Sequence, residues 1–171
     1  MVVRAAALLV LLATIPAPTR AGSALKRQIK VPGWPTLPFP FSEGVLHCTS
    51  CSEAQHGLND ACTLKISGNQ GFDFMAKPPA LVPGGISNQT KYAMKDIQSI
   101  VTAANATMDD VTSCTVWLRD IEDFEAMNDV YKTFFSVPYP TRAAAGGYAL
   151  AGKGALVEIA CEALAPCPYD A

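Results

Sequence analysis

Apolar residues recur with a helical period, and then in a strand-like pattern, through the second half of the chain. From Ser87 to about Ala104 they fall three or four positions apart, which predicts an amphipathic helix capped by Ser87. Val111 to Leu118 is rich in β-branched and aromatic residues, which favours a strand. A second helix is expected to start at Asp120 or Asp123, with an apolar face formed by Phe124, Met127, Tyr131, Phe134 and Phe135.

Strand-like segments lie on both sides of these helices. Thr63 to Ser67 alternates between apolar and polar residues and is stopped by the polar, glycine-containing run 68–71. Arg142 to Leu150 and Ala155 to Ala163 are two further candidate strands, joined by a glycine-containing turn. Strands and helices in this order predict an α+β fold, an antiparallel or mixed sheet with both helices on one face.

The second face of that sheet would need a cover. Four strand residues expected to point outward are too apolar to face water: Ala143, Ala145, Val157 and Ile159. An oligomer that buries this face is the simplest solution.

The N-terminal segment has the pattern of a secretory signal peptide over residues 1–21. Arg4 precedes the apolar run Ala5 to Ile15, which is too short to span a bilayer, and small residues follow up to Ala21. We therefore expect a protein that is secreted or held in the lumen of the secretory pathway, and that is soluble without membrane association after cleavage. A transit peptide to an organelle, or a retained anchor, is the alternative.

The remaining chain is expected to form one domain behind a lead-in. Residues 22–43 are proline-rich and should lie extended over a surface rather than inside a sheet. Residues 44–171 form the domain, and the polar stretch Val45 to Ala61 is interpreted as a loop insertion. The formal net charge of −2 and the lack of a basic run argue against a nucleic-acid partner.

Six cysteines in a chain with a signal peptide indicate disulfides, although the roughly 15 full pairings cannot be separated by sequence alone. Cys48 and Cys51 have CxxC spacing, but zinc would need further ligands and only His47, His56 and Cys62 are near. A thioredoxin-like site would need a strand before the motif and a helix after it. We therefore expect local disulfides in a surface loop and no metal. Two glycosylation sequons, at Asn88 and Asn105, are weak signals.

Two charged residues in the last third of the chain suggest a site. Arg142 follows a proline-rich turn, and Glu158 is isolated inside the apolar run 155–160, where a carboxylate needs a partner or a task. Together they could bind an anion and a water, or simply form an interface ion pair. Asn128 falls on the apolar face of the second helix, where its amide requires partners, whether structural or in a site.

In order and spacing, residues 63–165 resemble the RidA/YjgF/endoribonuclease L-PSP family. The similarity is carried by a turn like the family's SGQ turn, by the strand-to-helix passage 109–121, by a second helix, by a PxR signature and by a final strand: Ser67-Gly68-Asn69-Gln70, Trp117-Leu118-Arg119-Asp120, Phe124 to Tyr131, Pro140-Thr141-Arg142 and Leu156-Val157-Glu158-Ile159.

The resemblance implies a chorismate-mutase-like fold and a homotrimer with sites between neighbouring subunits. It implies hydrolysis of reactive enamines and imines, such as 2-aminoacrylate and 2-iminopropionate, to 2-keto acids and ammonia, without a cofactor. By this resemblance Arg142 holds the substrate carboxylate and Glu158 positions or activates water. Asn128, Ser67 and Gly68 would line the site.

Two positions depart from the family pattern. Ala144 stands where a cysteine or serine is frequent, and Phe41 where an aromatic residue at the edge of the site is often tyrosine. Both changes remove polar contacts, which leaves substrate choice open. A non-catalytic trimer that binds small carboxylates or acts as a chaperone is the main alternative. A ribonuclease is less favoured, because both histidines lie in the insertion.

Overall fold

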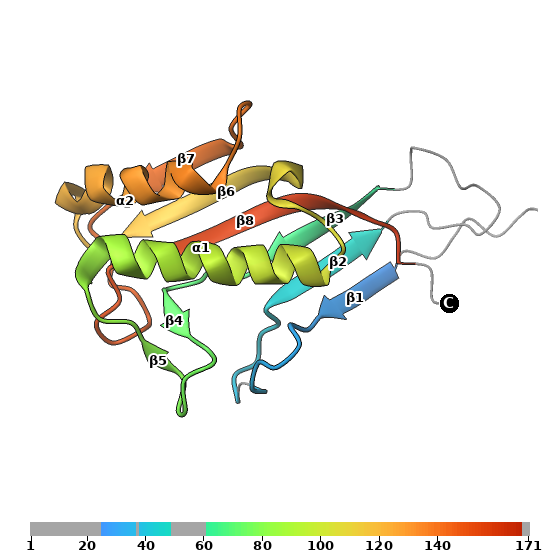
Figure 1. The fold of residues 1–171 in the computed structure, drawn as a ribbon, viewed down its shortest axis with the longest axis horizontal. Coiled ribbons are helices and arrows are strands. Elements are labelled where there is room, and N and C mark those ends of the chain that lie inside the picture. The colour runs from blue at the N-terminus through green and yellow to red at the C-terminus, as the bar shows by residue number, and fades with distance from the viewer. Residues whose placement is uncertain (1–24, 37, 49–60, 169–171) are drawn as a thin grey trace, which may run out of the picture.

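The computed structural model describes residues 25–36, 38–48 and 61–168. These residues form a six-stranded sheet in the order β1-β2-β3-β8-β6-β7, with helices α1 and α2 on one face (Figure 1). All neighbouring strands are antiparallel except β6 and β7, so the sheet is mixed, as the sequence predicts. Its strands are β1 (Leu25–Ile29), β2 (Gly44–Cys48), β3 (Ala61–Ile66), β6 (Val111–Leu118), β7 (Thr141–Ala145) and β8 (Val157–Pro166).

The two helices supply the apolar layer that covers the sheet. Helix α1 (Gly85–Ala103) begins two residues before Ser87, the expected cap. Gly84, in the left-handed conformation, occupies the cap position, and no side chain caps the helix. Helix α2 (Phe124–Tyr131) follows the short turn Ile121–Asp123, where Asp120 accepts a hydrogen bond from the Glu122 N–H. Short strands β4 (Phe72–Asp73) and β5 (Ala80–Leu81) pair separately beside α1 (Figure 1).

The N-terminal part departs most from the sequence interpretation. Leu25–Ile29 is the edge strand of the sheet, and its partner Gly44–Cys48 is a strand rather than the start of a loop. Neither segment contains a proline, and both place apolar residues on the core side, so strand pairing is favoured. The expected signal peptide, and residues 49–60 of the insertion, lie outside the described residues.

The C-terminal strands are also rearranged. The expected strand from Arg142 ends at Ala145, because Gly146 passes so close to Ile121 that a Cβ there would meet the Ile121 backbone. Strand β6 lies between β7 and β8, so the last two strands do not pair with each other. Consequently Arg142 and Glu158 are separated by a strand.

The apolar face of β8 points toward the helices. Val157 and Ile159 are fully buried in the core, so the expectation that they point outward is wrong. Ala143 is exposed and Ala145 partly so, as expected. The second face of the sheet is therefore more polar than predicted, with Ser113, Thr115, Glu158 and Glu162 among its half-buried residues.

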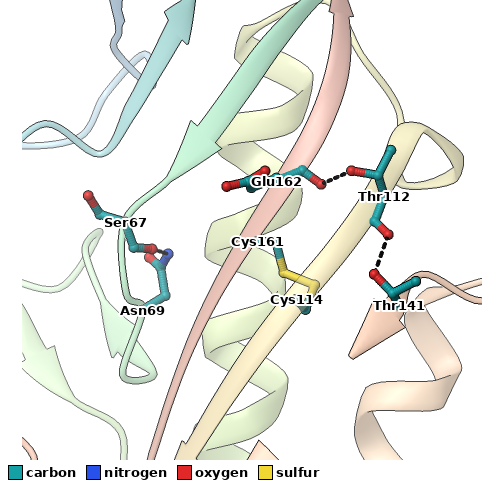
Figure 2. The surroundings of a disulfide bond; sticks show 7 residues. All are labelled: Ser67, Asn69, Thr112, Cys114, Thr141, Cys161 and Glu162. Carbon is teal, nitrogen blue, oxygen red and sulfur yellow. Dashed lines mark hydrogen bonds between the residues drawn. A yellow bond between two sulfur atoms is a disulfide. The ribbon is translucent and has the colours of Figure 1, made fainter. Parts of the chain in front are cut away.

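Disulfides link neighbouring strands within the core. Cys48 pairs with Cys62, and Cys114 pairs with Cys161, while Cys167 is disulfide-bonded as well. Figure 2 shows the Cys114–Cys161 bond between β6 and β8, where the two residues are direct register partners. In the described part of the chain, no helix combines the length and apolar character needed to cross a bilayer.

Asp96 of α1 is a buried acid and should make stability depend on pH. Its side chain is 7% exposed, and burial together with nearby Asp73 raises its pKa from 3.8 to about 8. Because the folded state favours the protonated acid, stability should fall as pH rises from about 4 to about 8. Asp96→Asn should therefore raise the free energy of unfolding at pH 8.5 by about 1–3 kcal/mol and change it little at pH 5, measured by urea denaturation. Exposed Asp109→Asn is the control; equal pH slopes in the wild type and in Asp96→Asn would contradict the assignment.

Candidate active site

Arg142 is held between two aromatic rings and an amide of α2. Its Nη1 donates to Asn128 Oδ1 at 2.8 Å. Its guanidinium carbon lies 4.7 Å from the centre of the Tyr131 ring and 5.5 Å from that of Phe124. Contacts between a guanidinium and aromatic faces are favourable and orient the planar fork. The expected need of Asn128 for a partner is thus met by the candidate site residue itself.

Sheet register explains why Arg142 reaches α2. It lies opposite Cys114 in the parallel β6–β7 pair, and Cys114 is part of the core on the helix side. Ala144, two residues further on, has the same direction and is exposed. The hydroxyl of Thr141, the first residue of β7, ties this strand to β6, because Thr141 Oγ1 donates to Thr112 O at 3.1 Å. Thr112 Oγ1 in turn donates to Glu162 O of β8 at 3.2 Å (Figure 2).

Tyr131 contributes a neutral hydroxyl beside this cation. Burial raises its pKa to about 12, although nearby Arg142 acts in the opposite direction. Its hydroxyl is buried without a hydrogen-bond partner among the described residues. The phenol therefore stays protonated at neutral pH and keeps a hydroxyl hydrogen that no described residue accepts.

Glu158 lies on the other face of the sheet. Its neighbours Val157 and Ile159 are fully buried against the helices, and side chains alternate along a strand, so the Glu158 carboxylate points away from them. Gln70 Nε2 donates to Glu158 Oε2 at 2.5 Å. A half-buried carboxylate with one amide partner keeps acceptor sites for a water or a substrate.

The turn that follows β3 is built around this carboxylate. Gly68 is packed so closely on it that a Cβ there would overlap the Glu158 side chain. Asn69 and Ile159 exchange two backbone hydrogen bonds of 2.9 Å, which hold the turn against β8. Asn69 Nδ2 also donates to Ser67 O at 2.7 Å. The predicted site residues Ser67 and Gly68 are thus brought to Glu158.

Phe41 is linked to the same turn through its neighbour. Ser67 Oγ donates to Ser42 O at 2.7 Å, so the segment before β2 is tied to the turn that carries Gly68. The Phe41 ring is 53% exposed and stacks on Phe39 with ring centres 6.0 Å apart. An exposed apolar ring at this edge is available for a ligand or a second chain.

The candidate residues therefore form two groups on opposite faces of the sheet. The arginine group contains Arg142, Asn128 and Ala144, and the glutamate group contains Glu158 with residues 67–70. Within a single chain the structure does not bring Arg142 and Glu158 together, because β6 separates their strands and their side chains have opposite directions.

Sequence reasoning missed three contributors to these groups. The sequence motif places Gln70 in the turn but indicates no role for it, although its side chain is the hydrogen-bond partner of Glu158. The helical period identifies Phe124 and Tyr131 only as residues of an apolar face, although both rings contact Arg142. All three residues belong to the sequence motifs that resemble the family, and this was the signal that could have identified them. The local pattern does not reveal which distant side chain each residue contacts.

Gly68→Ala should displace the Glu158 carboxylate and lower the free energy of unfolding by about 1–3 kcal/mol, measured by urea denaturation. The added methyl meets side-chain atoms beyond the Glu158 Cβ, so Glu158→Ala removes the obstacle. The cost of Gly68→Ala should therefore largely vanish in the Gly68→Ala/Glu158→Ala double variant. An equal cost in both backgrounds would show that backbone conformation, and not the carboxylate, requires glycine.

Comparison with known proteins agrees with this architecture. The family model described as endoribonuclease L-PSP matches residues 54–165. The 2-iminobutanoate/2-iminopropanoate deaminase of Capra hircus is 45% identical over 100 residues, which cover 57% of this chain and 69% of that protein. RidA from an Antarctic Psychrobacter bacterium has a TM-score of 0.62 at 28% identity, covering 80% of this chain and 98% of that chain. E. coli TdcF with bound serine has a TM-score of 0.65 at 25% identity, covering 81% and 98%.

These matches and the fold define the class of protein: a mixed sheet with two helices on one face. The chain belongs to the endoribonuclease L-PSP (RidA/YjgF) family.

Proposed function

We propose that this chain is a hydrolase that deaminates reactive imines and enamines of the 2-iminopropionate and 2-aminoacrylate type to 2-keto acids and ammonia. Several relatives at 41–45% identity carry the name 2-iminobutanoate/2-iminopropanoate deaminase. The observation that carries the proposal is the orientation of the Arg142 fork by Asn128 and two aromatic rings. Such a fork binds a carboxylate through two parallel hydrogen bonds.

The complete site would form between copies of the chain, in a homotrimer. One copy would contribute Arg142 and Asn128, and its neighbour would contribute Glu158 with the 67–70 turn. The opposite directions of the two groups support this arrangement, because one chain alone cannot place both against a small molecule. Closed rotational symmetry makes every such interface equivalent, so each trimer would hold three sites.

In the proposed reaction Arg142 holds the substrate carboxylate and Glu158 acts on a water. The Glu158 carboxylate accepts a proton from the water as the water oxygen bonds to the iminium carbon, which gives a tetrahedral carbinolamine. Glu158 then returns the proton to the nitrogen, the C–N bond breaks as the C=O bond forms, and the hydroxyl proton passes to the Glu158 carboxylate while ammonia leaves. An enamine substrate first takes a proton on carbon, and a neutral imine takes one on nitrogen, to become the iminium ion. Holding the water and the substrate in this orientation, next to a proton acceptor, lowers the activation barrier of the reaction.

A direct assay tests the activity. The full chain is mixed with 2-iminopropionate generated in situ, and the release of keto acid is compared with a buffer blank. Faster release that depends on enzyme concentration is expected. No acceleration by folded protein would overturn the deaminase proposal.

One observation favours a second candidate, a trimer that binds small carboxylates without turnover. Ala144 and Phe41 present no polar atom at positions beside the two groups, so fewer contacts would stabilise a transition state. A folded protein that binds 2-keto acids in calorimetry, loses this binding in Arg142→Ala, and does not release ammonia would support this candidate.

We also propose that the protein works outside the cytosol. The pattern of residues 1–21 and the two disulfides within the described core support this location. Sequencing the N-terminus of the mature protein is the test, and an intact Met1 would contradict it.

A further inference from the structure

Three cysteine sulfurs meet at one end of the sheet, away from both groups of the candidate site. They belong to Cys48 at the end of β2, Cys62 in β3 and Cys167 just beyond β8, and all three lie within 4.8 Å of one another. The side chains are buried, with exposed fractions of 1%, 1% and 8%. We call these three cysteines the thiol cluster. They lie 14 to more than 100 positions apart in the sequence.

Strand register creates the thiol cluster. Strand β3 lies between β2 and β8, with Cys62 opposite Ala165, so the chain reaches the same end of the sheet again at Cys167. Cys48 continues the β2–β3 pairing one step beyond the His47–Thr63 pair. The sequence led us to expect no metal here, because only His47, His56 and Cys62 lie near Cys48 along the chain; the fold adds Cys167 from the C-terminal end.

We propose that the reduced protein binds one thiophilic divalent ion, of the Zn²⁺ class, through the thiolates of Cys48, Cys62 and Cys167. Zinc holds thiolate sulfur at about 2.3 Å, so two sulfurs on one tetrahedral ion lie about 3.8 Å apart. The sulfurs already lie within 4.8 Å of one another, so small side-chain movements reach this geometry. Three protein ligands leave the fourth position of a tetrahedral ion for another donor.

The chemistry of the cluster makes the metal state and the disulfide state exclude each other. Cys48 is bonded to Cys62, and Cys167 is also disulfide-bonded. A phosphine or dithiol reductant supplies two electrons per disulfide, and each resulting sulfur takes up one proton. Each thiol then releases that proton when it bonds to the ion, so affinity rises with pH. Three buried thiolates without an ion would repel one another in an apolar setting, and a divalent cation removes most of that cost.

The matched control is the other disulfide. Cys114 and Cys161 are equally buried and cross-strand, but they offer only two sulfurs and belong to no group of three metal-binding side chains among the described residues. A metal site at the thiol cluster therefore predicts sensitivity to Cys167 and indifference to the Cys114/Cys161 pair.

The test uses the full chain, made in a reducing cytosol and purified without oxygen in the presence of a phosphine. Thiol titration first confirms that the cysteines are reduced. Cd²⁺ is then added as the probe, and its charge-transfer absorbance with thiolates is followed in the ultraviolet, with Zn²⁺ as competitor. We expect one ion per chain, and at least about ten-fold weaker binding in Cys167→Ser. Cys114→Ala/Cys161→Ala should bind as the wild type does.

Two results would overturn the proposal: no charge-transfer band from a fully reduced wild-type protein, or unchanged affinity in Cys167→Ser. A second measurement does not depend on the folding of variants. Zn²⁺ should protect Cys48, Cys62 and Cys167 of the wild type from alkylation, read by mass spectrometry, while Cys114 and Cys161 react at the same rate with and without the ion. Equal protection of all five would show a general effect on folding and would also overturn it. Deaminase activity enters neither measurement, so this proposal fails or stands separately from the proposed function.

Discussion

Arg142→Ala should lower kcat/KM for 2-iminopropionate by about 10²–10³-fold, because the variant lacks the cation that binds the substrate carboxylate. The loss should be larger than that of one ordinary hydrogen bond, since the guanidinium is already oriented by Asn128 and by the rings of Tyr131 and Phe124. Initial rates of keto-acid release over a range of substrate concentrations measure the effect.

Two variants make this result specific. Arg142→Lys keeps the charge but loses the planar fork and the bond pattern to Asn128, so it should recover only a small part of the activity. Arg119→Ala removes an exposed arginine at the end of β6, outside the arginine group, and should leave the rate unchanged. Wild-type rates in a folded Arg142→Ala protein would remove Arg142 from the reaction.

The elements that sequence predicted well are those with a strong local signal. Val111–Leu118 is a strand with the predicted bounds, and the helix that follows position 84 has the predicted apolar face, with Ala93, Ile97, Ile100 and Val101 buried. In both, the hydrophobic period is long enough to determine the element without help from the rest of the chain.

Elements that depend on distant partners were missed. Leu25–Ile29 has three consecutive polar residues and becomes a strand only because β2 pairs with it. The insertion of β6 between β7 and β8 is likewise set by the whole sheet, and it turned two neighbouring candidate strands into separated ones. Local pattern contains no record of such pairings, which explains why the outward direction of Val157 was predicted wrongly.

The same limit applies to the site. Isolation of Glu158 in an apolar run correctly marked it as a residue that needs a partner, yet the partner is Gln70, 88 positions away. Sequence reasoning placed Arg142 and Glu158 next to each other because their strands follow each other in the chain. The fold instead gives each its own supporting group, which changes the question from how they meet in one chain to whether two chains meet.

That question has a measurable answer in mixed assemblies. Arg142→Ala and Glu158→Gln proteins should each be almost inactive, but trimers that contain both should regain about one-third of the wild-type activity. Each mixed ring has one interface at which an intact Arg142 faces an intact Glu158, whichever protein is in excess. Co-expression with two different tags, followed by purification on both, isolates these mixed trimers for the keto-acid assay.

The matched control is the same purification with Arg142→Ala under both tags, which should regain no activity because none of its interfaces has an arginine. Recovery above this control can arise only if residues of different chains share a site. Mixed trimers as inactive as the control would contradict a shared site, and failure of the two tags to co-purify would contradict the oligomer itself. The opposite directions of Arg142 and Glu158 leave a single chain no route to the recovered rate, since β6 lies between the strands that carry them.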